Sequence, residues 1–153
     1  MAGSGRDGLK AVLEEIAVGL VLVFVTTVIQ AAFMIAGVRY VHWRVSWRDK
    51  VKDHIPKAIS VSVFTGWMFI SMVLQALLWA MFYLHHPAIT TLPDLESALY
   101  FSMVTYTSVG YGDVVLTGDW RMLAALEGAN GVIMFGWTTA LIFYVIQYVY
   151  KAR

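Results

Sequence analysis

Three long stretches of this chain are almost free of charged residues, which constrains its fold more than any other feature. No Asp, Glu, Lys or Arg occurs in residues 16–38 or 58–84, and Glu127 is the only one in residues 122–150. A helix crosses the roughly 30 Å hydrocarbon core of a bilayer with about 20 apolar residues. We therefore expect an all-α membrane protein with three transmembrane helices.

The composition excludes several classes of function. Only 14% of the residues are charged and 59% are hydrophobic, whereas about 25% are charged in an average soluble domain. A soluble enzyme is therefore not expected, and a net charge of +1 gives no strong field for nucleic acid. The chain has no cysteine and shows no phosphate loop, catalytic triad or metal-ligand cluster. We expect neither an enzyme nor a bound cofactor.

Basic residues indicate the orientation in the membrane. The linker of residues 39–57 holds six of the eleven Lys and Arg, whereas residues 85–121 hold only Arg121 against four acidic residues. Because cytoplasmic loops carry an excess of Lys and Arg, the linker should be cytoplasmic and residues 85–121 external. A multi-pass protein of the cell membrane follows, with an external N-terminal tail (1–15) and a cytoplasmic C-terminal tail (151–153).

The linker of residues 39–57 also has a helical pattern of its own. Its apolar residues recur every three or four positions, and its basic residues lie on another face. Two interpretations are open: an amphipathic helix in the inner membrane interface, or an extension of the first span (16–38) into the cytoplasm. The apolar positions are Tyr40, Trp43, Trp47, Val51 and Ile55, and the basic ones are Arg44, Arg48 and Lys52.

The external segment predicts a helix that is too short to cross the membrane. Residues 93–105 begin with Pro93 and place two acidic residues in the first turn. At about 1.5 Å per residue this helix reaches only partway across. The next residues, 107–113, contain Gly110 and Gly112 at alternate positions, which permits backbone angles closed to other residues. Irregular backbone at membrane depth is tolerated where it lines a water-filled cavity, so this stretch should line a pore.

At this point the residues resemble a known family. Residues 108–113 read Ser-Val-Gly-Tyr-Gly-Asp, which resembles the filter signature of tetrameric potassium channels. The resemblance extends over residues 58–150 and implies an outer helix, a re-entrant pore helix, a filter and an inner helix, with residues 16–38 as an extra helix. The expected bounds are 58–84 for the outer helix, 93–105 for the pore helix, 107–113 for the filter and 122–150 for the inner helix.

The resemblance implies a homotetramer in the lipid bilayer, in which rings of backbone carbonyls replace the hydration shell of K⁺. K⁺ is then the permeant ion and not a cofactor. A Cβ at Gly112 should not fit, and the side chains of Val109 and Tyr111 should brace the filter against the pore helix. The filter residues are Ser108, Val109, Gly110, Tyr111 and Gly112, of which the first four would supply the carbonyls.

Residues around the filter depart from the family pattern. Ser108 stands where the family has Thr and keeps the hydroxyl that would complete the innermost ion site. Leu116 stands where the family often has Pro, and Val104 where some members carry a carboxylate. Thr107 and Asp113 should support the filter, with Asp113 attracting cations at the external mouth. Tyr100 either donates its hydroxyl to Asp113 or packs against the outer helix.

The inner helix carries candidates for a hinge and a gate. Gly131 falls where the family has its hinge glycine, although close helix packing would also explain it; for Gly128 we favour packing. Four Phe143 side chains, one from each chain, would form an apolar constriction that closes by dewetting. A register rotated by one residue would instead put Ala140 and Tyr144 in the pore. The expected pore face is Val132, Phe135, Thr139, Phe143 and Gln147, with lipid or helix packing as the alternative for its aromatic residues.

Polar residues inside the spans suggest further contacts. Glu127 either braces the filter from behind, through Thr105, Tyr106 or Thr107, or reaches water or Arg121 near the outer end of its helix. In the first span, a threonine pair and a glutamine within one turn should hydrogen-bond to a neighbouring span. We expect the first span itself to lie at the periphery, beside the outer helix. These residues are Thr26, Thr27 and Gln30.

The sequence therefore predicts a subunit of a potassium-selective channel. Two alternatives remain open: a weakly selective cation channel, and a non-conducting membrane subunit that modulates a partner. His85 and His86 lie in the outer loop, either simply solvated or as sensors of external pH. The gating stimulus is not predicted.

Overall fold

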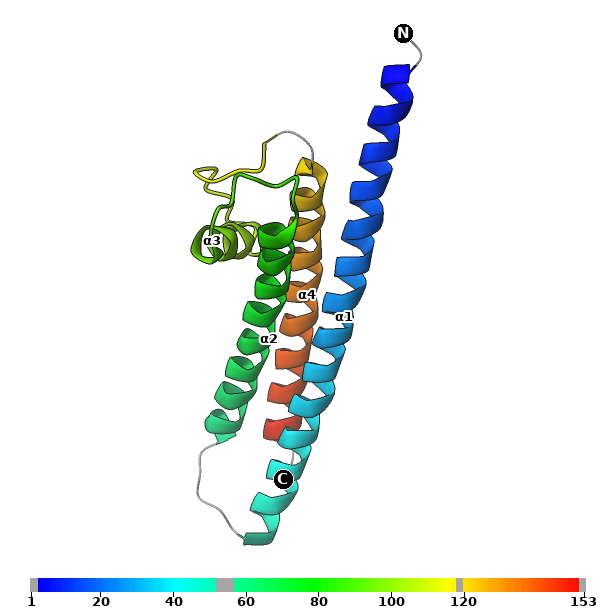
Figure 1. Cartoon of the computed structure of the whole chain (residues 1–153). Helices are drawn as coiled ribbons and strands as arrows, with labels where there is room; N and C mark the ends of the chain where they lie inside the picture. Colours follow the sequence, from blue (N-terminus) through cyan, green and yellow to red (C-terminus); the bar gives the residue numbers. More distant parts are fainter. Residues whose placement is uncertain (1–2, 52–56, 118–119, 152–153) are drawn as a thin grey trace.

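The protein is described by a computed structural model that covers residues 3–51, 57–117 and 120–151. Within these residues all regular structure is helical, and the helices form an elongated bundle (Figure 1). The elements in chain order are α1 (Gly3–Val51), α2 (Lys57–His85), α3 (Leu95–Tyr106) and α4 (Arg121–Lys151).

Three of the helices are long and apolar enough to cross a membrane, as the charge pattern predicts. The candidate spans are Gly8–Trp47, Lys57–His85 and Arg121–Lys151. The observed ends of α2 and α4 differ from the predicted ones by one residue each. The helix α3 is short and lies beside the C-terminal end of α2, on the side away from α1 (Figure 1).

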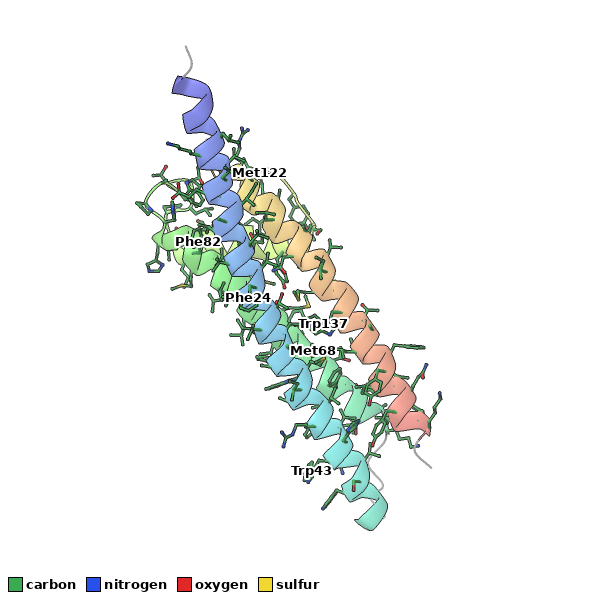
Figure 2. All side chains as sticks on the ribbon, turned by 90° about the vertical axis from the view of Figure 1, so that its right-hand side faces the viewer. Phe24, Trp43, Met68, Phe82, Met122 and Trp137 are labelled. Carbon is green, nitrogen blue, oxygen red and sulfur yellow. The ribbon has the colours of Figure 1, made fainter. Side chains whose placement is uncertain are left out.

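The first helix is longer than predicted. It continues without a break for 49 residues from Gly3 to Val51, so residues 39–51 extend the first span. The interfacial alternative, a separate amphipathic helix, is therefore wrong for this part of the linker; Lys52 and Ile55 lie outside the described residues. Trp43 and Phe24 of α1 are 61% and 69% exposed, and Figure 2 places them far apart along its length.

The helix α1 packs against both α2 and α4, and not against the outer helix alone. Toward the N-terminal end of α1, Glu15 is buried and accepts a hydrogen bond of 3.1 Å from the backbone nitrogen of Met122. A carboxylate at this position satisfies one of the free N–H groups that begin α4. Toward the C-terminal end of α1, Val41 and Val45 are buried in an apolar cluster with Val145 of α4.

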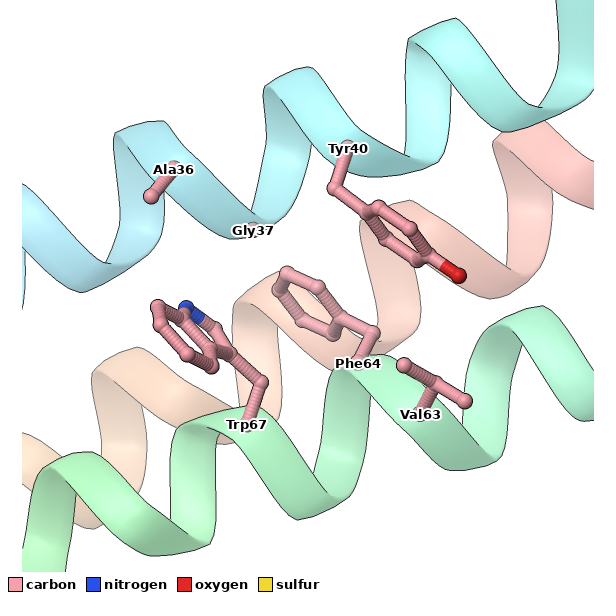
Figure 3. Close-up of a pocket in the computed structure, with 6 residues that line it drawn as sticks. All are labelled: Ala36, Gly37, Tyr40, Val63, Phe64 and Trp67. Atoms are coloured by element: carbon pink, nitrogen blue, oxygen red, sulfur yellow. The ribbon is translucent and has the colours of Figure 1, made fainter.

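Close approach between α1 and α2 depends on a glycine. A Cβ at Gly37 would lie 2.8 Å from the ring of Phe64 and 2.9 Å from that of Trp67. Trp67 stacks on Phe33 and donates a 2.9 Å hydrogen bond to its carbonyl. Small residues at such contacts permit the van der Waals packing that holds helices together in lipid. Beside this contact lies a groove of about 360 Å³, lined by Ala36, Gly37, Tyr40, Val63, Phe64 and Trp67 (Figure 3).

Candidate pore site

The pore helix α3 begins at a capping residue. The side chain of Asp94 accepts a 2.8 Å hydrogen bond from the backbone nitrogen of Ser97, which is the usual N-cap arrangement. The same hydrogen bond lowers the pKa of Asp94. The helix therefore starts at Leu95, two residues later than predicted, and ends at Tyr106.

The end of α3 holds the start of the predicted filter, residues 108–112. The backbone nitrogens of Val109 and Gly110 donate to the carbonyl of Val104 at 3.0 and 3.2 Å, and that of Ser108 donates to Thr105 at 2.9 Å. These bonds satisfy carbonyls that the end of a helix otherwise leaves free. The filter is thus folded back on the last turn of α3, and its position follows that turn.

The filter backbone alternates between two conformations. Ser108, Gly110 and Gly112 have positive φ angles of 59°, 56° and 77°, and the residues between them do not. Every second residue of this segment thus lies in the left-handed region, which glycine adopts readily. A Cβ at Gly112 would meet no atom of this chain within 4 Å. The expected lack of room is therefore wrong within one chain, and the backbone angle is what requires glycine.

The filter is open on one side in the single chain. All residues from Ser108 to Asp113 are exposed, and the side chains of Val109 and Tyr111 are 52% and 73% exposed. The expected bracing of these two side chains against the pore helix is not present within one chain. Thr107 caps α3 instead, and its hydroxyl donates to the carbonyl of Met103 at 2.7 Å.

The residue that follows the predicted filter, Asp113, is tied to the middle of α3. The hydroxyl of Tyr100 donates to the carboxylate of Asp113 at 2.6 Å, so the hydrogen bond predicted for this pair is confirmed and the packing alternative is not adopted. This bond holds the pKa of Asp113 below its usual range. Leu116 is buried in the core, so it anchors the chain that follows the filter.

Glu127 is fully buried behind α3. Its carboxylate accepts a 2.7 Å hydrogen bond from Tyr83 of α2 and a further hydrogen bond from Ser102 of α3. The predicted partners Thr105, Tyr106 and Thr107 are therefore wrong, and so is the alternative in which Glu127 reaches water. The acid does contact α3, at a residue six positions before Ser108.

Gly131 lies against the end of the pore helix. A Cβ at this position would overlap the carbonyl oxygen of Tyr106 and lie 2.7 Å from its carbonyl carbon. A Cβ at Gly128 would lie 3.5 Å from the carbonyl of Thr105, whereas one at Gly136 would meet nothing within 4 Å. Close packing thus accounts for Gly131, and the hinge remains a prediction.

The expected pore face of α4 is mostly uncovered. Val132, Thr139, Phe143 and Gln147 are exposed, whereas Phe135 is half-buried against the core. The competing residue Tyr144 turns toward α1, where its hydroxyl lies 3.1 Å from Nε2 of His42. This contact favours the register with Phe143 on the uncovered face; Ala140 is exposed as well.

Polar residues of α1 reach neighbouring helices as predicted, with one exception. Thr26 accepts from Asn130 of α4 at 2.9 Å, and Gln30 bonds to residues of both α2 and α4. Thr27 bonds only to the carbonyl of Val23 in its own helix, so the prediction for Thr27 is wrong. Sequence reasoning missed Gln75 as a partner of Gln30, although it is the one amide side chain in residues 58–84.

The two outer histidines differ in their surroundings. Nδ1 of His85 lies 2.8 Å from the carbonyl of Met81. The ring of His86 lies between Phe82 and Trp120, with centroid distances of 5.3 and 4.0 Å. His86 is therefore part of an aromatic cluster and not a freely solvated loop residue.

Comparison with known proteins identifies the family. A sequence model described as "Ion channel" matches residues 62–148, which is more than half of the chain. The chain belongs to this ion channel family. The matched region includes α3, the filter and most of α2 and α4, and leaves α1 outside. No curated protein and no solved structure matches the chain.

Proposed function

We propose that this ion channel is selective for K⁺. The observation that carries the proposal is the alternating backbone of residues 108–112, in a Ser-Val-Gly-Tyr-Gly segment held at the end of a half-length helix. Backbone carbonyls aimed to one side replace the water oxygens around a dehydrated K⁺. In this proposal the carbonyls of residues 108–111 bind K⁺, the hydroxyl of Ser108 completes the innermost site, and Asp113 attracts cations at the mouth.

We further propose that four chains assemble around a central axis. One chain provides a single carbonyl at each level of the filter, which is too few to surround an ion. Cyclic symmetry is usual for homo-oligomers. Exposure of Val109 and Tyr111, and of the uncovered face of α4, supports an assembly in which other copies complete the surroundings of these residues.

The proposed orientation places the filter and the N-terminus outside the cell. The start of α1 and the loops around α3 lie at the same end of the bundle (Figure 1). Arg39 and Arg44 lie toward the opposite end of α1, and the excess of basic residues in the linker supports a cytoplasmic position there. Protease should remove a tag at Met1 from the external side only.

Ion flux into liposomes tests the function directly. Purified protein should pass K⁺ much faster than Na⁺, and crosslinking in mild detergent should end at the tetramer. Equal K⁺ and Na⁺ flux would support the weakly selective alternative. No flux of either ion from an intact tetramer would support the modulatory alternative.

The gate is proposed at Phe143, which is 62% exposed on the uncovered face of α4. Phe143→Ala should raise the resting K⁺ flux without changing selectivity, because it widens an apolar constriction that excludes water. The matched variant Tyr144→Ala removes a ring that faces α1 and should not raise flux. Increased flux from Tyr144→Ala alone would mean that the register is rotated, and no effect from either would place the gate elsewhere.

A further inference from the structure

A chain of buried hydrogen bonds joins α1 to the last residue of the pore helix. The hydroxyl of Tyr106 donates to the side-chain oxygen of Gln75 at 2.8 Å. The amide nitrogen of Gln75 donates to the side-chain oxygen of Gln30 at 2.9 Å. The amide nitrogen of Gln30 then donates to the hydroxyl of Thr138 at 2.9 Å. All four helices therefore meet in one polar network.

The network is closed to solvent and largely satisfied. Gln30, Gln75 and Ser71 are fully buried and Tyr106 is 1% exposed. Ser71 adds a second donor to the side-chain oxygen of Gln30, at 3.0 Å. A buried amide without a partner is costly in an apolar medium, so the four helices are held in the one arrangement that satisfies all these groups.

The far end of this network is next to the filter. Tyr106 is directly followed by Thr107 and Ser108, and the carbonyls of the preceding turn accept from the filter backbone. Apolar packing is non-directional. The hydrogen bond that the Tyr106 hydroxyl donates to Gln75 is directional, and it fixes how the last turn of α3 is rotated about its axis. Functional groups need support of this kind to hold their positions within about 0.5 Å.

We propose that Gln30 and Gln75 are positioning residues for ion selection, so that α1 acts on the filter through Gln75 and Tyr106. The proposal rests on the proposed K⁺ selectivity and adds a role for α1, the helix that lies outside the matched family region. None of the three residues contacts the ion. Their effect passes through the rotation of α3 and the carbonyl geometry that follows from it.

The first test is a double-mutant cycle on the full-length chain in planar bilayers, with the K⁺/Na⁺ permeability ratio as readout. Tyr106→Phe and Gln30→Leu should each lower the ratio about threefold to tenfold, in the range seen for coupled positions. The double variant should be no worse than the single ones, because either change breaks the same chain of bonds. Thr27→Val is the matched control, since its hydroxyl bonds only within α1, and it should leave the ratio unchanged.

The second test separates positioning from space filling at Gln75. Gln75→Glu keeps an oxygen for the Tyr106 hydroxyl and, when protonated, a donor for Gln30, so its ratio should stay near that of the unmodified protein. Gln75→Leu fills the same space without the acceptor or the donor, and its permeability ratio should fall by about as much as that of Tyr106→Phe. Crosslinking checks that each variant still forms the same oligomer.

Several results would overturn the proposal. The first is an unchanged K⁺/Na⁺ permeability ratio in Gln30→Leu. The second is a double variant in which the effects of Gln30→Leu and Tyr106→Phe multiply. The third is a normal permeability ratio in Gln75→Leu together with a reduced one in Gln75→Glu. If Gln30→Leu does not assemble, Tyr106→Phe and the Gln75 pair decide the outcome. An unmodified protein that does not distinguish K⁺ from Na⁺ would instead contradict the proposed function.

Discussion

The two sides of the pore helix end are built differently. On the buried side, Ser102 and Tyr106 bond to side chains of α2 and α4, and Gly131 lies against the backbone of Tyr106. On the open side, the filter is held by backbone bonds to the end of α3 and by the Tyr100–Asp113 pair. Within one chain, the buried side of the α3 end is therefore closely packed, whereas the predicted filter, residues 108–112, is exposed.

The largest expected effect comes from crowding the buried side. Gly131→Ala introduces a Cβ into the space of the Tyr106 carbonyl, so α3 and α4 must separate. The loss of stability should be about 3 kcal/mol or more, at the upper end of overpacking costs, and should appear as a lower thermal midpoint in detergent. Gly136→Ala, where a Cβ meets nothing within 4 Å, should change little. Normal stability with altered gating in Gly131→Ala would favour the hinge.

Removing the buried acid should have the next largest effect. Glu127→Leu leaves the hydroxyl of Tyr83 without its acceptor, which costs about 1–3 kcal/mol, whereas the hydroxyl of Ser102 can still donate to the carbonyl of Ala76. Glu127→Gln keeps one oxygen acceptor and should lose clearly less stability. Chemical unfolding in detergent measures both variants; equal losses would mean that packing, and not hydrogen bonding, is what Glu127 contributes.

A change on the open side should affect selectivity more than folding. Gly112→Ala places a side chain at a φ of 77°, which costs about 1 kcal/mol for an ordinary residue, and the filter backbone should relax away from its alternating form. Discrimination of K⁺ from Na⁺ should be lost while the oligomer survives. Gly66→Ala, in α2 where a Cβ meets no neighbour, should retain selectivity. Retained selectivity in Gly112→Ala would argue against the filter assignment.

The smallest effect concerns the outer mouth. The Tyr100 hydrogen bond lowers the pKa of Asp113, so the bond stabilises the mouth above the ordinary pKa of Asp, and this stability is lost as the pH falls through the lowered value. Tyr100→Phe should return the pKa of Asp113 toward its ordinary value, so acid should reduce K⁺ flux at a higher pH than in the unmodified protein. Identical acid titrations of flux would show that the pair does not control the mouth.

The sequence predicts the helices well because charge and length carry that information. The gaps between charged residues define α2 and α4 to within one residue, and two acidic residues after Pro93 indicate the start of α3. The Tyr100–Asp113 pair could be predicted because both residues belong to one short segment. The sequence does not define the end of α1, because a helical pattern in residues 39–51 does not show whether a helix bends at the membrane surface.

Contacts between helices were harder to predict, since they depend on how each helix is rotated about its axis. The sequence predicts Glu127 near Thr105, Tyr106 or Thr107, but the packing of the helices gives it Tyr83 and Ser102 as partners. Gln75 could have been found as the lone amide of its span. The contact of Gly131 with Tyr106 has no local signal, because a glycine in a helix is compatible with bending and with close packing alike.

The length of α1 has a consequence for how deeply it sits in the membrane. The candidate span Gly8–Trp47 has 40 residues, which is roughly 60 Å of helix, but only residues 16–38 are free of charge, and these suffice for a hydrocarbon core of about 30 Å. Glu15 and Arg39 lie next to the two ends of this charge-free stretch, so a shift along the membrane normal would carry a charge into hydrocarbon. The depth of α1 is therefore set by these charges, and Glu15, Thr26 and Gln30 transmit it to the other helices through their hydrogen bonds.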